Sequence, residues 1–133
     1  MGPDEYVKEV MTAMKKFREQ NILCDTVLVT DDGEIWAHSV VLAAVSPFLC
    51  STFRGLGGTK AKKVRYNVSL PGCSASAVEL VLQFLYSGQL AMPSTYQHVD
   101  EFSRILFVCK SLGIDVGKLN GARVTFENSI ERY

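Results

Sequence analysis

The N-terminal stretch of the chain repeats apolar side chains with the period of an α-helix. Between residues 4 and 20 they recur every three or four positions, and charged side chains fill most of the positions between them. This spacing brings the apolar side chains onto one face of a helix. The pattern predicts an amphipathic helix whose apolar face consists of Tyr6, Val7, Val10, Met11, Met14 and Phe17.

Shorter apolar segments follow, separated by turn residues. Residues 26–30 and 34–37 are rich in β-branched and aromatic side chains and flank an Asp-Gly pair, which predicts a β-hairpin. The apolar run 40–45 precedes Ser46-Pro47, which predicts two short helices because serine and proline are favoured where a helix begins. The further predicted elements are a strand at 66–70, a helix at 76–88, a strand at 89–92 and a helix at 99–113.

The helix predicted at 76–88 is apolar on nearly all sides. Glu79 is the only formal charge between Tyr66 and Val99. A helix without a polar face belongs at the centre of a fold. Ser76 and Glu79 have the spacing of a capping box, which predicts that the helix begins there. The order of elements predicts an α+β fold, with a small sheet covered by helices.

Composition narrows the classes of function. Apolar residues make up 47% of the 133 residues, and 14 Lys+Arg balance 14 Asp+Glu, as in one soluble globular domain. A net charge of zero gives no general attraction to nucleic acid or to an anionic membrane. The four cysteines lie far apart, which indicates a reducing compartment and leaves a disulfide open. Because histidines and cysteines lack metal-ligand spacing, we expect no metal and no cofactor.

The ends of the chain fall outside the predicted core. Residues 1–5 are expected to be disordered or a cloning remnant, residues 6–121 to form the domain, and residues 122–133 to form a tail. Within the tail, residues 123–126 alternate polar and apolar side chains. We expect them to add as a strand to an open sheet edge of the same chain or of a partner chain.

A basic segment at residues 54–65 carries five cations and no acid. Its three glycines and its lack of hydrophobic periodicity predict a flexible surface loop. Its candidate partner-binding residues are Arg54, Leu56, Lys60, Lys62 and Lys63.

Asp25, His38 and Ser39 together carry the side chains of an acyl-transfer triad. Ser39 lacks the Gly-x-Ser-x-Gly context of a nucleophile elbow. The preferred interpretation is that His38 caps the following helix while Asp25 satisfies local backbone groups. A small Ser/His hydrolase is kept only as a remote alternative, and we expect no enzyme.

Three separated motifs resemble those of the BTB/POZ domain family. They are residues 23–29 (LCDTVLV), residues 37–48 (AHSVVLAAVSPF) with Phe53, and residues 84–90 (FLYSGQL). The resemblance extends from about Tyr6 to Leu119. It implies a homodimer whose first helix packs across the partner, and a domain that serves as a platform for other proteins inside the cell.

The family has two main branches, and this chain departs from both. Transcription regulators that recruit corepressors usually carry Arg or Lys after the motif histidine, in a groove at the dimer interface; here Asp25 and His38 are present, but Ser39 replaces the cation. Cullin ubiquitin-ligase adaptors usually show a hydrophobic-x-Glu motif beyond the helix that ends at Phe53, where no acid precedes Glu79 here. We expect a nuclear transcription regulator, with the cullin adaptor, and a cytoplasmic location, as alternatives.

Overall fold

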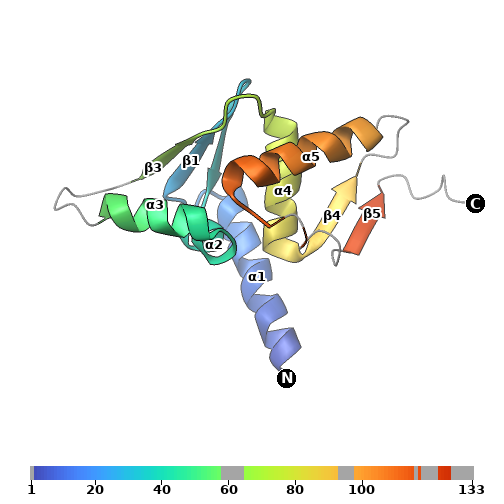
Figure 1. Cartoon of the computed structure of the whole chain (residues 1–133). Helices are drawn as coiled ribbons and strands as arrows, with labels where there is room; N and C mark the ends of the chain where they lie inside the picture. Colours follow the sequence, from blue (N-terminus) through green and yellow to red (C-terminus); the bar gives the residue numbers. More distant parts are fainter. Residues whose placement is uncertain (1, 58–64, 93–97, 116, 118–122, 127–133) are drawn as a thin grey trace, which may run out of the picture.

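Helices and short strands alternate along the chain in the α+β order that the sequence predicts. The computed structural model describes residues 2–57, 65–92, 98–115, 117 and 123–126. Figure 1 shows α4 running through the middle of the fold, α5 crossing it, and α1 projecting away from the body. The elements are α1 (Pro3–Glu19), β1 (Thr26–Val29), β2 (Glu34–Ala37), α2 (Ser39–Val45), α3 (Pro47–Gly57), β3 (Tyr66–Ser69), α4 (Ala75–Ser87), β4 (Gln89–Met92), α5 (His98–Leu112) and β5 (Arg123–Phe126).

The main sheet has three strands in the order β2-β1-β3. β1 pairs antiparallel with β2, with Leu28 opposite Ile35, and parallel with β3, with Leu28 opposite Val68. The backbone N–H of Thr30 donates to the carbonyl of Gly33 at 2.8 Å, which closes the hairpin turn. The predicted hairpin is therefore confirmed. Because β1 is the central strand, Leu28 is fully buried.

The core is built around α4, as its apolar sequence predicts. Val78, Val81 and Leu82 are fully buried. The helix begins at Ala75 and not at Ser76, because Ser74 is its N-cap residue and accepts a hydrogen bond from the backbone N–H of Ala77 at 3.2 Å. The predicted capping box is therefore wrong. Glu79 is left free for a contact with another helix.

The junction between α2 and α3 is held by a buried serine. Ser46 Oγ accepts from the backbone N–H of Leu49 at 3.0 Å and donates to the carbonyl of Leu112 at 2.7 Å. The predicted Ser-Pro helix start is therefore confirmed. The same hydroxyl ties the beginning of α3 to the end of α5, so one side chain satisfies groups from two helices.

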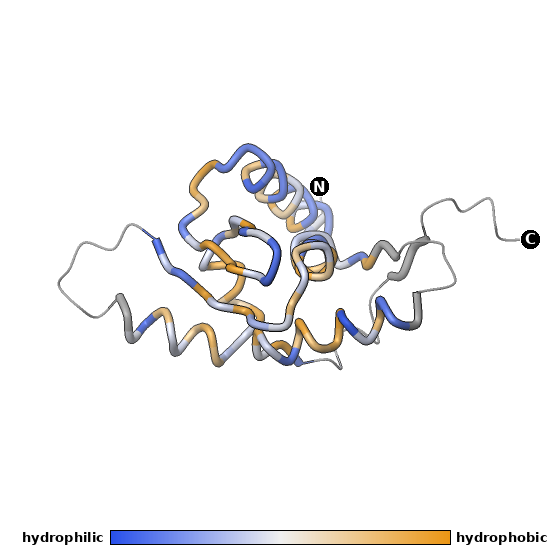
Figure 2. Tube along the Cα trace, turned by 90° about the horizontal axis from the view of Figure 1, so that it is seen from above, coloured by the Kyte–Doolittle hydropathy of each residue, from blue (hydrophilic) through white to orange (hydrophobic). Residues whose placement is uncertain are grey.

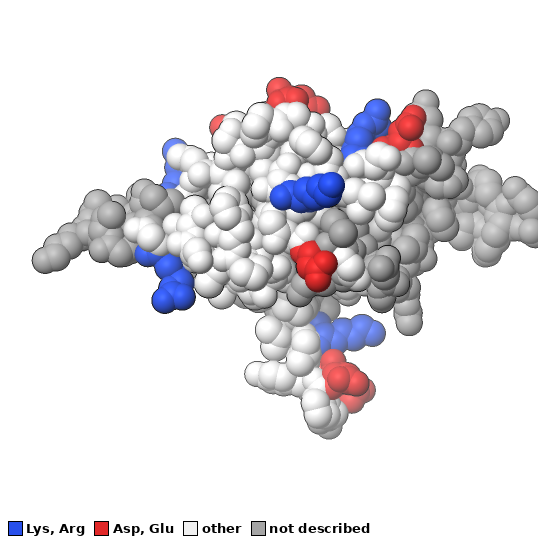
Figure 3. All heavy atoms as spheres, in the orientation of Figure 1, with Lys and Arg blue, Asp and Glu red and all other residues white. Residues whose placement is uncertain are grey.

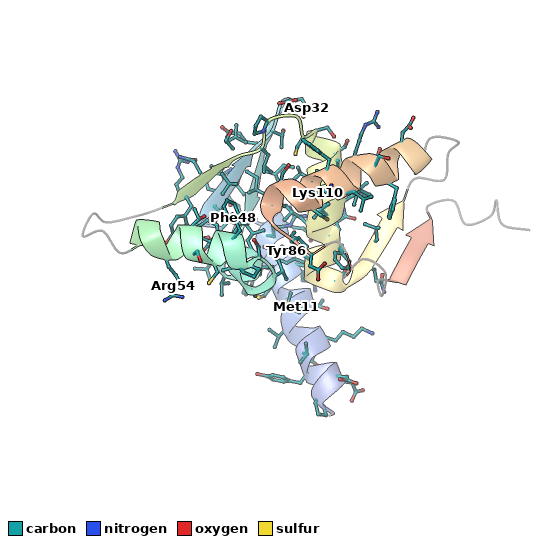
Figure 4. The ribbon with its side chains drawn as sticks, in the orientation of Figure 1. Met11, Asp32, Phe48, Arg54, Tyr86 and Lys110 are labelled. Atoms are coloured by element: carbon teal, nitrogen blue, oxygen red, sulfur yellow. The ribbon has the colours of Figure 1, made fainter. Side chains whose placement is uncertain are left out.

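The basic segment begins as a helix and not as a loop. Because α3 extends to Gly57, Arg54 and Leu56 belong to its last turns. A single glycine costs a helix only about 1 kcal/mol relative to alanine, so Gly55 does not end α3. Figure 4 shows Arg54 pointing away from the body, consistent with its exposed side chain. Lys60, Lys62 and Lys63 lie outside the described residues.

The N-terminal helix begins earlier than expected. α1 starts at Pro3, with Gly2 at the N-cap position and the Gly2 N–H donating to Glu5 Oε1 at 2.9 Å. Proline suits the first helical position because it has no N–H to satisfy there. Residues 3–5 therefore form the first turn of α1, and the expectation that they are disordered is wrong.

The tail strand pairs within its own chain. β5 lies parallel to β4, with Leu90 opposite Val124, in a separate two-stranded sheet. Leu90 is 1% exposed, so β4 is anchored to the core and presents its edge to the tail. Among the described helices, none combines the length and the apolar composition that a bilayer crossing requires.

Candidate interaction surfaces

α1 exposes most of its apolar face. None of its residues is buried, and Tyr6, Val7 and Val10 are 62%, 57% and 41% exposed. Figure 2 shows hydrophobic and hydrophilic segments alternating along this helix, and Figure 3 shows it standing clear of the body. Phe17 is also exposed. A contiguous apolar face of this kind is uncommon on a soluble monomer.

The six residues predicted for this face do not all play one role. Met14 is partly buried and packs against the hydrophobic core. Met11 is also partly buried and lines a groove between α1 and the end of α4, together with Leu85 and Tyr86. The two methionines therefore face the body of their own chain. Tyr6, Val7, Val10 and Phe17 form the exposed part, which we call the α1 face, although Val7 also lines the groove beside Met11.

Arg18 fastens α1 to α4. Its guanidinium donates to both carboxylate oxygens of Glu79, with Nη1 3.2 Å from Oε1, and lies 5.5 Å from the centre of the Tyr86 ring. The Arg18 side chain is 10% exposed. A charge this buried requires a partner, and the bidentate pair supplies one. In the sequence pattern Arg18 is one of the charged residues between the apolar positions of the helix, and no local signal predicts this contact.

His38 belongs to a buried network with Tyr86. Nε2 lies 2.9 Å from the carbonyl oxygen of Ile22, and Nδ1 lies 2.6 Å from the Tyr86 hydroxyl. Because a carbonyl only accepts, Nε2 carries a hydrogen and donates to Ile22, and Nδ1 shares a second hydrogen bond with the Tyr86 hydroxyl. The backbone N–H of His38 donates to the same hydroxyl at 3.1 Å. Both ring nitrogens of His38 are therefore engaged.

Burial controls the acidity of the Tyr86 hydroxyl. Desolvation raises the pKa of Tyr86 to about 12, outweighing the opposite effects of the His38 backbone N–H and of the Arg18 charge. The hydroxyl therefore stays protonated throughout the physiological range and can donate to His38. A hydroxyl held in this protonated state is not set up to release a proton in catalysis.

Asp25 binds the first turn of α2. Its Oδ1 accepts from the backbone N–H of Ser39 at 2.7 Å, and its Oδ2 accepts from the Ser39 hydroxyl at 2.6 Å. Thr26 adds a third donor to Oδ1 at 3.2 Å. Although His38 occupies the N-cap position, its side chain does not cap the helix; the cap comes from Asp25. The expectation that Asp25 satisfies local backbone groups is confirmed, whereas the role given to His38 is wrong.

The triad arrangement is not formed by these three side chains. Ser39 donates to Asp25, while both nitrogens of His38 bond elsewhere. A triad requires the serine on the histidine and the histidine on the aspartate. The same contacts show that Ser39 satisfies the Asp25 carboxylate without a cation.

Exposed apolar side chains flank Asp25 and Ser39 in the sequence, and none of them was predicted as a site residue. Leu23 is 78% exposed and adopts a positive φ of 60°, and Val40 is 65% exposed. Ile22 is 39% exposed, and its N–H donates to the carbonyl of Phe17 at the end of α1. Leu23 and Val40 lie within two residues of Asp25 and Ser39. Their position in the recognised motifs was the available signal.

The four cysteines are free thiols. Cys73 and Cys109 are buried, whereas Cys24 and Cys50 are only partly buried. Burial raises the pKa of the Cys109 thiol to about 11. It also raises the pKa of Cys24, whose Sγ lies 3.7 Å from His38 Nε2. The thiols of Cys24, Cys73 and Cys109 are thus less acidic than that of a reactive cysteine.

Comparison with known proteins decides the family. The family model of the BTB/POZ domain matches residues 14–115. The chain belongs to the BTB/POZ family. The match includes the Asp25–Ser39 contact and the His38–Tyr86 network but begins inside α1, so Tyr6, Val7 and Val10 precede it. BTB/POZ domains are protein–protein interaction modules and are generally not enzymes.

Relatives of this BTB/POZ domain include proteins of different kinds. Kelch-like protein 2 of Homo sapiens is 33% identical over 86 residues, and Kelch-like protein 3 of Bos taurus is 30% identical over 86 residues. Each match spans 64% of this chain but 14% of the relative. The BTB domain of zebrafish PATZ1 has the same fold, with a TM-score of 0.66 and 17% identity over 90% of both chains.

Proposed function

We propose that this BTB/POZ domain forms a homodimer through the α1 face and recruits other proteins as a dimer. The observation that supports the proposal is the exposure of Tyr6, Val7, Val10 and Phe17 on a helix that carries no buried residue. Aromatic side chains are enriched at interfaces. A dimer would remove from water the apolar surface that a monomer leaves exposed.

The attachment of α1 also suits an interface. Arg18 and Met14 fasten the C-terminal half of the helix to α4 and the core, so the outward direction of the α1 face is set before a partner arrives. A surface that is already ordered loses less conformational entropy on binding. This favours association through α1 over packing of the same face on its own core.

The oligomeric state tests the proposal. Light scattering at tens of micromolar should give twice the single-chain mass of 14.7 kDa. Val10→Asp would place an unpaired carboxylate in the interface and should give monomers or insoluble protein. Lys16→Gln, on the polar side of α1, changes the net charge by the same amount and should leave the dimer intact. A wild-type mass of one chain would contradict the proposal.

Val10 is a sharper probe than the methionines of the same helix. Met14 packs against the core, so a charge there would also destabilise the single chain. Val10 is 41% exposed in the single chain, and its substitution should leave folding unchanged. Circular dichroism of Val10→Asp should therefore match the wild-type helix content. Loss of that content would instead point to packing within one chain.

For the class of partner, we propose corepressor-type recruitment within a nuclear transcription regulator, without enzymatic activity. The absence of an acidic side chain in Arg54-Gly55-Leu56 at the end of α3 supports this choice over a cullin. The alternative is a cullin ubiquitin-ligase adaptor, which the identity to Kelch-like proteins favours. Since Ser39 already satisfies Asp25, corepressor docking here would rely on the exposed Leu23 and Val40 more than on charge.

A further inference from the structure

A groove of about 450 Å³ lies beside the tip of the β1–β2 hairpin, where Figure 4 places Asp32 at the end of the molecule away from α1. One wall is the tip of the β1–β2 hairpin and the turn before α4, with Asp31, Asp32 and Gly72. The other wall is α5, with Arg104 and Phe107, and buried apolar residues such as Ala77 and Val108 line the groove between them. No residue of α1 takes part.

Two exposed carboxylates stand on the hairpin wall. Asp31 Oδ1 accepts from the N–H of Gly72 at 3.1 Å, and Asp32 Oδ1 accepts from the N–H of Ala75 at 2.7 Å. These bonds hold both side chains in place. Among the described residues, Oδ2 of each carboxylate accepts no hydrogen bond. Figure 3 shows the acidic surface at the upper rim, where Figure 4 places Asp32.

An aromatic ring lies beside the carboxylates. Phe107 is 47% exposed although it is the largest apolar side chain of this wall. Its ring rests on Gly72, where an added Cβ would come within 3.2 Å of Cε2. Gly72 has a φ of 84° and also donates its N–H to Asp31. Gly72 therefore contacts both the Phe107 ring and the Asp31 carboxylate.

We propose that this groove binds an arginine side chain of an extended partner peptide. A guanidinium can stack on an aromatic face while its N–H groups pair with carboxylates, and lysine offers only a point charge. Phe107 supplies the face, and the free oxygens of Asp31 and Asp32 supply the acceptors. Arg104 also lines the groove, but its Nη1 lies 3.4 Å from Oε1 of Glu101 on its own helix, which offsets its charge.

The full chain can be titrated with the peptide acetyl-Leu-Arg-Leu-amide and followed by ¹⁵N NMR. Saturable shifts are expected at the backbone amides of Gly72, Ser74, Ser103 and Phe107. The same peptide with citrulline in place of arginine has nearly the same shape without the charge. It should bind at least about tenfold more weakly, because the charge-assisted hydrogen bonds are lost.

Variants of the groove complete the test. Asp31→Asn with Asp32→Asn keeps an oxygen that accepts the two backbone N–H groups, and it should weaken the arginine peptide at least about tenfold. Phe107→Leu removes the ring and should also weaken it, whereas Glu34→Gln, on the same hairpin outside the groove, should not. The proposal would be overturned if the two peptides bound equally or if the Asn variant bound the arginine peptide as tightly as the wild type. It would also be overturned by the absence of a saturable shift or by shifts confined to α1. None of these results depends on whether the domain dimerises.

Discussion

The hydroxyl group of Tyr86 on α4 accepts a hydrogen bond from the backbone of His38 and lies 2.6 Å from the Nδ1 atom of its ring. The two residues are 48 positions apart and are 1% and 4% exposed. The other ring nitrogen, Nε2, donates to Ile22, which follows α1. A single buried network therefore connects the start of α2, the central helix and the segment beyond α1.

Removing the Tyr86 hydroxyl should destabilise the fold. Tyr86→Phe would leave the N–H and the Nδ1 atom of His38 without partners in a buried site, at a cost of about 2 kcal/mol in the free energy of unfolding. Urea denaturation followed by circular dichroism measures this difference. Tyr66→Phe is a suitable control because Tyr66 is only partly buried. Equal losses in both variants would contradict the role of the network.

The difference in the free energy of unfolding between the wild type and Tyr86→Phe should depend on pH in the alkaline range. Burial raises the folded pKa of Tyr86 from its ordinary value of 10.0 to about 12. The neutral hydroxyl therefore favours the folded state below pH 10, and that contribution is lost as the pH rises toward 12. The stability difference between wild type and Tyr86→Phe should shrink across this window. Cys109 titrates in both proteins, so its effect cancels; a constant difference would contradict the assignment.

Asp25 should contribute to stability as the cap of α2. Asp25→Ala would leave the backbone N–H and the hydroxyl of Ser39 without their acceptor and should cost about 1–2 kcal/mol in the free energy of unfolding. Ser39→Ala removes only the hydroxyl donor and should cost less. Chemical denaturation of the two variants gives the order. A larger loss for Ser39→Ala would show that the carboxylate is not the cap.

Pairing of the tail strand should appear in hydrogen exchange. Because β5 pairs with β4, amides of residues 123–126 should exchange more slowly than in an unfolded peptide. Truncation after residue 121 should speed exchange in β4 while leaving α5 protected. Exchange of the tail at the rate of an unfolded peptide would contradict the strand.

The residues at the end of α3 predict that the domain does not bind a cullin. Calorimetry of the domain with a cullin N-terminal region at micromolar concentration should show no saturable binding, because residues 54–57 carry no carboxylate. Two of these four residues, Gly55 and Gly57 in the last turns of α3, have no side chain that could contact a cullin. Saturable binding would move the proposed function to the ligase-adaptor alternative.

Local chemistry predicted those parts of the fold that depend on neighbouring residues. The Asp-Gly turn and the Ser46-Pro47 helix start need only a few adjacent residues, and both are confirmed. The cap of α4 was predicted wrongly, because Ser76 has Glu79 three positions later, as a capping box requires, whereas Ser74 has Ala77 there. In the structure the Ser74 hydroxyl nevertheless accepts from the backbone N–H of Ala77 and caps the helix.

Periodicity and the three motifs were sufficient to predict the amphipathic α1, the buried α4 and the BTB/POZ family. Only the tertiary structure decided what the polar residues do. Arg18 looks like a solvated cation on α1 until the packing of α4 brings Glu79 to it, 61 residues away. His38 and Ser39 look like catalytic partners until Tyr86 and Asp25 take their hydrogen bonds. Burial along a helix follows from local spacing, whereas a hydrogen-bond partner depends on which distant segments the folded chain brings together.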